Sequence, residues 1–424
     1  MSEKLIIKNF ADIENIEIYL NKINILIGPQ ASGKSVCAKL LFYFKNFVWE
    51  ILNAVEDGQS KRQIDASYTK KFEEYFPPDS WSNDSFMIRY EIADTFIEIS
   101  KSVEQTKLSL TYSDFYKKKL SSLRKFVTKT RKNIATAEPI GLARKPDLFL
   151  ITRNYWTETL SQSLEQRATF SQLFIPASRS FFAFLERGIF SFLSNNQALD
   201  PFLTTFGSVY ESMKRLDYTY KVRNLKSQNK NKEVGEEIER LVEKILCGKY
   251  LYEKGKDFIV TSKRRVSLAN SSSGQQETLP LTIMISSLAY FSSDHTVYVE
   301  EPEAHLFPSA QRDVVELIAT VFNYRSNQLQ FFITTHSPYI LTAINNLLQA
   351  GILYQEAKDD VKVKLNSIVS QHKALISQDI SAYSLMNGKC KNIICQETGL
   401  IDASIIDGVS DELAIEFDQL LNLT

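Results

Sequence analysis

The clearest chemical signal is the run GPQASGKS, Gly28 to Ser35, which we call the phosphate loop. Its spacing matches G-x-x-x-x-G-K-S, in which backbone N–H groups wrap around phosphate oxygens. In this pattern Lys34 reaches the β and γ phosphates of a nucleotide, and Ser35 offers its hydroxyl to Mg²⁺. The run follows an apolar strand, Ile23 to Ile27, and precedes an apolar helix. We therefore expect ATP and Mg²⁺ as ligands, with phosphate contacts from Gly28, Pro29, Gln30, Ala31, Ser32, Gly33, Lys34, Ser35 and Val36.

A pair of carboxylates, Glu300 and Glu301, ends the apolar run Thr296 to Val299. A strand that delivers two carboxylates at its end can place the first on the Mg²⁺ shell and the second beside the γ phosphate. We assign Glu300 to the metal and Glu301 to the attacking water as the catalytic base. Asp is the usual first residue of such a pair, so Glu300 adds a methylene. The alternative is a solvated strand end.

Two further segments fit the same chemistry. The run NSSSGQQE, Asn270 to Glu277, here called the signature run, combines hydroxyls, a glycine and the start of a helix expected from Thr278 onward. Such a combination can bind an anion, although a linker or a helix cap has the same pattern of residues. His336 follows the buried strand Gln330 to Ile333 and could hydrogen-bond a γ phosphate, or serve structure alone.

In this order the four segments resemble the Walker A, signature, Walker B and switch-histidine series of ABC-type ATPases. The wording YVEEPEAHLFP, Tyr298 to Pro308, and FFITTHSPYIL, Phe331 to Leu341, resembles the RecF and OLD-like branch. The resemblance implies that two subunits sandwich two ATP molecules head to tail. Ser272, Gly274 and Gln275 would then act on the nucleotide of the partner copy, while Glu301, His336 and Lys34 catalyse hydrolysis.

Departures from that family pattern leave two details open. The signature run has Ser271 and Ser273 where the family has Leu and the first Gly, so the register of the contacting serine is uncertain by one. The family's D-loop falls at Ala304 to Phe307. The segment Phe174 to Ser180 resembles the Q-loop region but has no glutamine, and Ser178 or Arg179 is the substitute.

The elements that must position these residues indicate an α/β fold, a P-loop ABC-type ATPase core with an N-terminal antiparallel β subdomain and an inserted helical lid or arm. Alternating runs predict strands over Lys4 to Lys8, Ile13 to Tyr19 and, as a meander, Phe86 to Ser113. Helical patterns follow, with a strand at Leu173 to Pro176 and a polar loop at Lys226 to Lys232. Strands at Tyr250 to Tyr252 and Asp257 to Val260 lead to the signature run. The sequence predicts a division into four parts. Residues 1–112 and 248–345 form the first and second parts of the ATPase core, residues 113–247 form the helical insert, and residues 346–424 form a small docking tail.

The charge and amino-acid composition of the chain limit the kinds of partner that we expect it to bind. With 50 basic and 50 acidic residues, any nucleic-acid contact needs a local patch. Lys117 to Lys132, the basic segment, holds eight Lys or Arg and no acid, and is either a solvated helix face or a nucleic-acid contact. The longest apolar stretch, Leu279 to Phe291, is too short to cross a bilayer. Four scattered cysteines and no signal peptide predict a cytoplasmic protein.

Sequence features that related ATPase classes have, and that this sequence lacks, help to choose among possible functions. Heptad arms of the SMC type are absent from the pattern, and the stretch after Leu341 is too short for the Toprim nuclease domain of OLD proteins. Its end, DGVSDELAIEFDQLLNL, predicts an amphipathic helix with Leu413, Phe417, Leu420 and Leu421 that docks on the core or on an effector. The resemblance implies an ATPase subunit of an anti-phage system of Septu, retron or PARIS type, a homodimer or larger homo-oligomer that restrains a nuclease or toxin. The alternatives are a RecF-like DNA repair ATPase that clamps DNA, and a binding module with a dead site.

Overall fold

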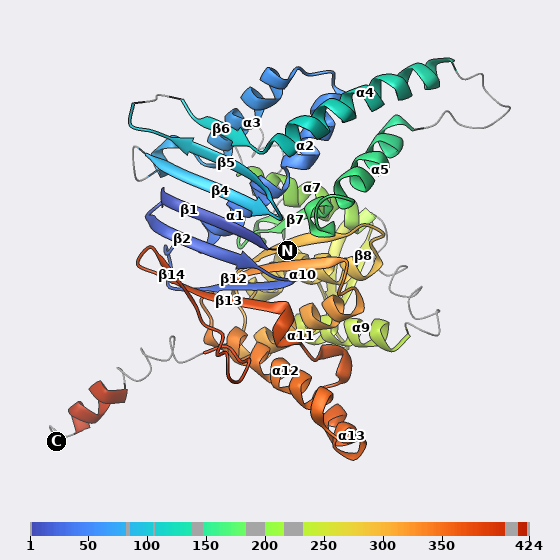
Figure 1. The fold of residues 1–424 in the computed structure, drawn as a ribbon. Coiled ribbons are helices and arrows are strands. Elements are labelled where there is room, and N and C mark those ends of the chain that lie inside the picture. Colours follow the sequence, from blue (N-terminus) through green and yellow to red (C-terminus); the bar gives the residue numbers. More distant parts are fainter. Residues whose placement is uncertain are drawn as a thin grey trace.

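Two sheets organise the fold, and helix α1 (Lys34–Lys45) packs between them (Figure 1). The computed structural model describes residues 2–81, 85–104, 107–136, 147–183, 200–215, 232–402 and 414–421. The predicted α/β class and the N-terminal antiparallel sheet are confirmed.

The core sheet has the strand order β14-β13-β3-β12-β11-β7. Every neighbouring pair is parallel except β13 with β14. The carboxyl ends of parallel strands meet at one edge, and ligands of open α/β sheets bind there. The strands are β3 (Ile23–Ile27), β7 (Ser171–Ile175), β11 (His295–Glu300), β12 (Leu329–Thr335), β13 (Ile380–Met386) and β14 (Lys389–Asn392).

Side chains of the core strands alternate between two buried faces, as the period of two requires. Ile23, Ile25 and Ile27 pack with the helices of one face, whereas Leu26 packs with α1 and the N-terminal sheet on the other. Because both faces of the sheet are buried, the sequences of these strands are nearly continuous runs of apolar residues. The helices of the first face are α9 (Lys232–Leu246), α10 (Ser273–Ser287), α11 (Pro308–Tyr324) and α12 (Pro338–Glu356).

The N-terminal sheet is antiparallel, with the order β2-β1-β4-β5-β6. Its strands are β1 (Glu3–Phe10), β2 (Ile13–Leu20), β4 (Phe86–Ile92), β5 (Thr95–Lys101) and β6 (Ser109–Tyr112). The predicted meander over Phe86 to Ser113 is thereby confirmed. A small third sheet contains β8 (Lys249–Glu253), β9 (Lys256–Val260) and β10 (Arg265–Ser267).

The remaining helices cover the N-terminal sheet or extend from the core (Figure 1). They are α2 (Phe47–Glu56), α3 (Lys61–Tyr75), α4 (Asp114–Thr136), α5 (Leu148–Ser161), α7 (Pro201–Arg215) and α13 (Asp359–Ile368). Short 3-10 helices lie at Pro78–Ser80, Gln166–Thr169, Leu268–Asn270, Leu288–Tyr290, Gln371–Lys373 and Ser377–Asp379. In the part of the chain that the structure describes, no helix is both long and apolar enough to cross a membrane.

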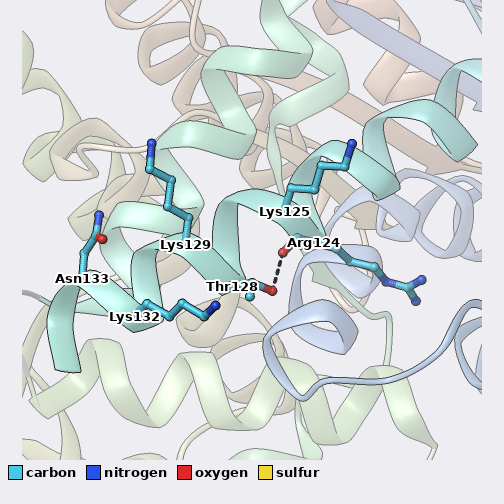
Figure 2. Close-up of a pocket in the computed structure, with 6 residues that line it drawn as sticks. All are labelled: Arg124, Lys125, Thr128, Lys129, Lys132 and Asn133. Carbon is cyan, nitrogen blue, oxygen red and sulfur yellow. Dashed lines mark hydrogen bonds between the residues drawn. The ribbon is translucent and has the colours of Figure 1, made fainter. Parts of the chain in front are cut away.

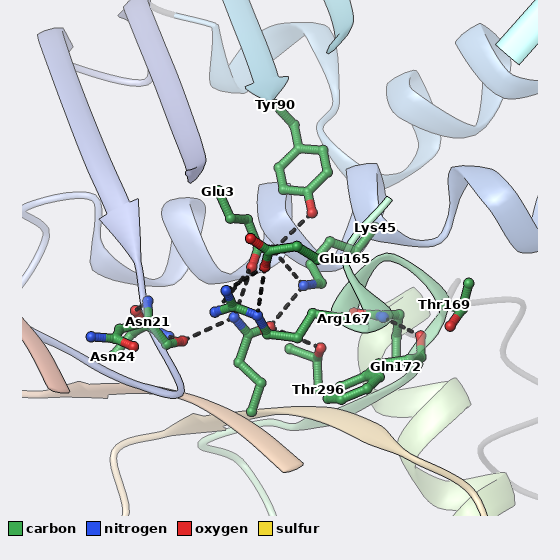
Figure 3. A network of polar contacts seen from close by, with 12 residues as sticks. Glu3, Asn21, Asn24, Lys45, Tyr90, Glu165, Arg167, Thr169, Gln172 and Thr296 are labelled. Carbon is green, nitrogen blue, oxygen red and sulfur yellow. Dashed lines mark hydrogen bonds and ion pairs between the residues drawn. The ribbon is translucent and has the colours of Figure 1, made fainter. Parts of the chain in front are cut away.

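A buried polar network ties the two sheets to α1 (Figure 3). Lys45, in the last turn of α1, pairs with Glu3 of β1 at 2.5 Å and donates to Gln330 of β12 at 2.7 Å. Tyr90 of β4 also donates to Glu3, and Arg167 lies 3.7 Å from it. Burial opposes ionisation of Glu3, but the Lys45 and Arg167 charges prevail and hold its pKa below the usual value. The network fixes the end of α1 opposite the phosphate loop.

Two predictions about element bounds differ from the structure. The helix after the signature run begins at Ser273, five residues before the expected Thr278. β13 comes from the predicted tail 346–424, yet it pairs with β3 inside the core sheet. Residues 414–421 form the expected helix, in which Phe417 and Leu420 are exposed and do not dock on the core. Leu413 and most of the polar loop Lys226 to Lys232 lie outside the described residues.

Candidate nucleotide site

The phosphate loop joins β3 to α1 at the carboxyl edge of the core sheet. Gly33 caps α1 with φ 96°, and no side chain caps the helix, so the first amides of α1 remain available to an anion. Gly28 is required for another reason. A Cβ there would lie 2.1 Å from the carbonyl oxygen of Leu385 in β13, so only glycine fits between β13 and the loop.

Lys34 closes the loop on itself. Its Nζ donates to the carbonyl oxygens of Gly28 at 2.8 Å and Pro29 at 2.7 Å. Burial lowers the pKa of Lys34, against the opposing field of the Glu301 and Glu303 carboxylates. The ammonium is therefore preorganised at the loop, and β and γ phosphates would replace the two carbonyls as its acceptors.

Glu300 has the environment of a metal ligand. Its side chain is buried, Oε2 accepts from the Ala177 amide at 3.3 Å, and Oε1 accepts no hydrogen bond among the described residues. Burial raises the pKa of Glu300, while Lys39 and the nearby Ser35 hydroxyl lower it. A buried carboxylate oxygen without a partner, next to a hydroxyl, fits Mg²⁺, which takes one or two protein oxygens together with phosphate and water.

Glu301 lies beside His336 and Glu303. The Oε1 atom of Glu301 is 3.7 Å from Nδ1 of His336, and Nε2 of His336 is 3.8 Å from Oε1 of Glu303. Both Glu301 and His336 are partly exposed, whereas Glu303 is buried. The strands β11 and β12 thus bring the predicted base and the predicted γ-phosphate sensor together, within reach of a water or phosphate between them.

The backbone of Glu301 adopts φ 44°, which is costly for a residue with a side chain. Three hydrogen bonds hold it there. Its N–H donates to Thr334 at 2.9 Å, and its carbonyl accepts from Arg179 and from the Ala304 amide, each at 3.0 Å. This unusual turn directs the second carboxylate away from the path of the strand and toward His336.

The signature run begins α10. Ser272 is the N-cap, and its side chain and that of Gln275 form a reciprocal capping box. Gln275 also donates to the Leu246 carbonyl at 2.7 Å. Gly274 packs against the His305 carbonyl, where a Cβ would come within 2.9 Å. A groove of about 570 Å³ follows this helix start, lined by Ser272, Gly274, Gln275, His305 and Phe307 among others.

The two Q-loop substitutes are in different environments. Ser178 is exposed. Arg179 is fully buried, and its guanidinium donates to the backbone carbonyls of Pro176, Glu277, Glu300 and Glu301. Because these carbonyls occupy its donors, Arg179 does not face a nucleotide as a Q-loop glutamine would.

Two site residues escaped sequence reasoning, Glu303 and Thr334. Glu303 accepts from Thr335 at 2.7 Å and from the His336 amide at 2.9 Å, so it positions the histidine. Thr334 has a buried hydroxyl without a hydrogen bond among the described residues, as does Ser32 of the predicted phosphate loop. The acidic spacing EEPEAH, Glu300 to His305, was a readable signal for Glu303, whereas Thr334 has none.

The basic segment lies on α4, away from the phosphate loop (Figure 1). Its apolar residues Leu120, Leu123 and Val127 are buried, and Phe126 is half-buried. Figure 2 shows Lys125, Lys129 and Lys132 along one side of the helix, lining a shallow groove of about 480 Å³. These three lysines are exposed.

Comparison with known proteins identifies one domain. Residues 196–341 match the profile of the AAA ATPase domain, a stretch that contains the signature run, the carboxylate pair and His336. Over these residues the chain is similar to AAA ATPase domains. No curated protein matches the chain.

Solved structures with a similar arrangement include an SMC head domain from Thermotoga maritima, at 11% identity and a TM-score of 0.37 over 92% of this chain and 98% of that one. An Smc head domain bound to the C-terminal domain of ScpA, from Pyrococcus furiosus, has 13% identity and a TM-score of 0.37 over 92% and 95% of the two chains. A structure of the recombination mediator RecF has 12% identity and a TM-score of 0.31 over 93% and 98%. These superpositions are loose and bear on neither function nor partner.

Proposed function

We propose that the chain hydrolyses ATP at a site completed by a second copy. One observation carries the proposal. The phosphate loop, the carboxylate pair and His336 converge at one edge of the core sheet. The hydrogen bonds of Ser272 and Gln275, by contrast, run to each other and to Leu246, within their own part of the chain. The signature run that contacts a nucleotide on the phosphate loop would thus belong to a partner copy of the chain.

The residues divide the chemistry among them. Lys34 and the amides that begin α1 bind the phosphates, and Ser35 and Glu300 hold Mg²⁺, which neutralises the developing charge when it is bound. Glu301 accepts a proton from the attacking water, since its carboxylate is partly exposed beside His336. His336 donates to the γ phosphate and is oriented by Glu303 through the backbone. The start of α10 from the partner places amide dipoles on the same phosphate.

Mixing two inactive variants tests the composite site. Lys34→Ala removes the phosphate ligand, and Ser272→Arg fills the start of α10 with a large cation. In a mixed dimer one of the two sites combines an intact phosphate loop with an intact signature run. We expect each variant alone to be inactive and an equal mixture to recover about a quarter of the wild-type turnover, because half of the randomly paired dimers have one intact site. Phosphate release measures the outcome.

The control for mixing is a chain that carries both substitutions, added to either single variant. Neither combination contains an intact composite site, so the turnover must stay at the background of the single variants. An equal turnover of the Ser272→Arg variant alone and the wild type would contradict the proposal, because the signature run would then be dispensable. An inactive wild type would favour a binding module with a dead site.

We further propose that the ATP-bound dimer regulates a separately encoded effector, a nuclease or toxin, in anti-phage defence. The family resemblance of the sequence motifs supports this role. Exposed apolar side chains suit a partner protein, namely Ile415, Phe417 and Leu420 in the C-terminal helix and Val363 and Ile368 in α13.

The basic segment supports a second candidate, a DNA clamp of the RecF type. Arg124 and Lys119 donate to the backbone carbonyls of Gln59 and Thr159 and so have structural roles. Lys125, Lys129 and Lys132 of α4 are among the residues that line the groove (Figure 2). Three cations at this spacing suit the phosphates of a nucleic-acid backbone.

Neutralising these three lysines distinguishes the two candidates. If the chain clamps DNA, changing all three to alanine lowers the salt slope of duplex binding by about three, because each phosphate contact releases about one counterion. Fluorescence anisotropy at several salt concentrations measures the slope. The matched control changes Lys358, Lys364 and Lys391, which are exposed elsewhere, and keeps the same net charge. Equal slopes for both triple variants would leave the effector role as the better candidate.

A further inference from the structure

A buried arginine connects the signature run to the carboxylate pair. Arg179 is 0% exposed, and Nη1 donates to the carbonyl oxygens of Pro176 at 2.8 Å and Glu300 at 2.7 Å. Nη2 donates to the carbonyl of Glu301 at 3.0 Å, and Nε to that of Glu277 at 3.2 Å. One guanidinium therefore fixes two successive peptide groups of the carboxylate pair and one of α10.

Glu277 completes the connection from the side of α10. Its carboxylate accepts from the backbone amides of Arg179 at 3.0 Å and Ser180 at 2.7 Å. It also forms an ion pair with the Arg179 guanidinium at 3.3 Å. Glu277 is buried one turn after the capping box of Ser272, so the start of α10 and this ion pair move as one rigid helix.

A buried charge pair is usually less stabilising than apolar packing of the same volume. The pair of Arg179 and Glu277 has a different effect, because it fixes the backbone conformation of the carboxylate pair. Glu301 holds an unfavourable positive φ, and Arg179 supplies one of the three backbone hydrogen bonds that keep it there, beside those with Thr334 and Ala304. An apolar side chain of the same volume would fill the space, but the carbonyls of Glu300 and Glu301 would lose the guanidinium as a donor.

We propose that Arg179 is a positioning residue that couples the signature run of one chain to the carboxylate pair of the same chain. The inference rests on the proposed function. In a head-to-tail dimer the signature run contacts the partner's ATP, while the carboxylate pair serves the ATP on the chain's own phosphate loop. Binding at one site then steadies Glu301 at the other through α10, Glu277 and Arg179, so the two sites hydrolyse ATP cooperatively.

Arg179→Lys tests the coupling, because lysine keeps the charge and loses the planar fork. We expect kcat to fall by about 10–100-fold, as misplaced catalytic groups typically cost. The KM for ATP stays within about twofold, since the phosphate loop is untouched. The Hill coefficient of hydrolysis falls to about one, since the path between the sites is broken. ATP-dependent dimerisation, followed by light scattering, persists.

Arg325→Lys is the matched control. Arg325 is also buried and donates to the backbone carbonyls of Leu288 and Ser293, which precede β11, whereas the carboxylate pair lies at the end of that strand. It should lose stability in a thermal melt yet keep kcat and the Hill coefficient. If Arg179→Lys does not fold, Glu277→Gln replaces it. The amide keeps one acceptor oxygen for the backbone N–H groups of Arg179 and Ser180, and loses the second acceptor together with the ion pair.

The outcomes separate this inference from the proposed function. A wild type that hydrolyses ATP cooperatively, with Arg179→Lys indistinguishable from Arg325→Lys, overturns the coupling and leaves the ATPase intact. A wild type that neither hydrolyses ATP nor dimerises with it overturns the proposed function. Loss of kcat with an unchanged Hill coefficient also contradicts the coupling, because Arg179 would then position Glu301 without linking the two sites.

Discussion

Replacing Glu301 by glutamine is expected to lower kcat by about 10²–10⁴-fold, the usual contribution of a general base. The amide has the same shape and can occupy the same space beside His336, but it cannot accept the proton of the attacking water. Lys34, Ser35 and Glu300 are unchanged, so ATP still binds. The variant should accumulate the ATP-bound dimer, which light scattering detects as a whole-number rise in mass on adding Mg-ATP.

Glu303→Gln is a useful comparison, because Glu303 contacts His336 without belonging to the carboxylate pair. It should lower kcat less than Glu301→Gln does and leave the dimer transient. Unchanged hydrolysis in the Glu301→Gln variant would show that another group activates the water. A Glu301→Gln protein that stays monomeric with Mg-ATP would rule out the sandwich, whereas one that is oligomeric without ATP would indicate a constitutive scaffold.

Gly28→Ala should damage both stability and nucleotide binding. The new methyl group would lie 2.1 Å from the Leu385 carbonyl oxygen, so the loop or β13 must move. Overpacking of this kind costs about 1–3 kcal/mol of unfolding free energy. A displaced loop also loses one or two charge-assisted hydrogen bonds to phosphate, which lowers ATP affinity by about 100-fold. Urea unfolding and a fluorescent ATP analogue measure the two effects.

Gly351→Ala provides the matched control for that change. Gly351 lies in α12, where a Cβ would meet the Leu375 carbonyl oxygen at 1.9 Å, so the steric conflict is of the same kind. This variant should lose stability and keep ATP affinity once it is folded. Equal losses of affinity in both variants would mean that instability alone explains the Gly28→Ala result, and that the contact with β13 does not shape the loop.

Local patterns predicted the phosphate loop and its flanking elements well. β3 has the predicted bounds Ile23–Ile27, and α1 begins at the expected Lys34. This agreement has a physical cause, since glycine spacing and an apolar strand are dictated within a dozen residues. The early start of α10 was also readable, because Ser272 and Gln275 satisfy the S-x-x-Q spacing of a capping box.

What depends on distant contacts was not predictable from local patterns. β13 carries Ser381 and Ser384 between its apolar residues, and only pairing with β3 makes it a core strand. Arg179 was predicted as a nucleotide ligand because the segment Phe174 to Ser180 resembles a Q-loop region. Its burial follows from Glu277, which lies 98 residues further along the chain. A short window of sequence cannot reveal contacts between residues that are so far apart in the chain.

The contact between Gly28 and β13 also bears on how the protein is made. The Leu385 backbone forms one wall of the phosphate loop, so the loop obtains its final shape only after β13 has joined β3. At about 5–20 residues per second, a ribosome needs about 20–70 s to add the roughly 350 residues between them. A nascent chain therefore carries its complete nucleotide-binding sequence long before it can use it. Under the proposed function, unfinished chains on the same messenger RNA therefore cannot yet pair through ATP.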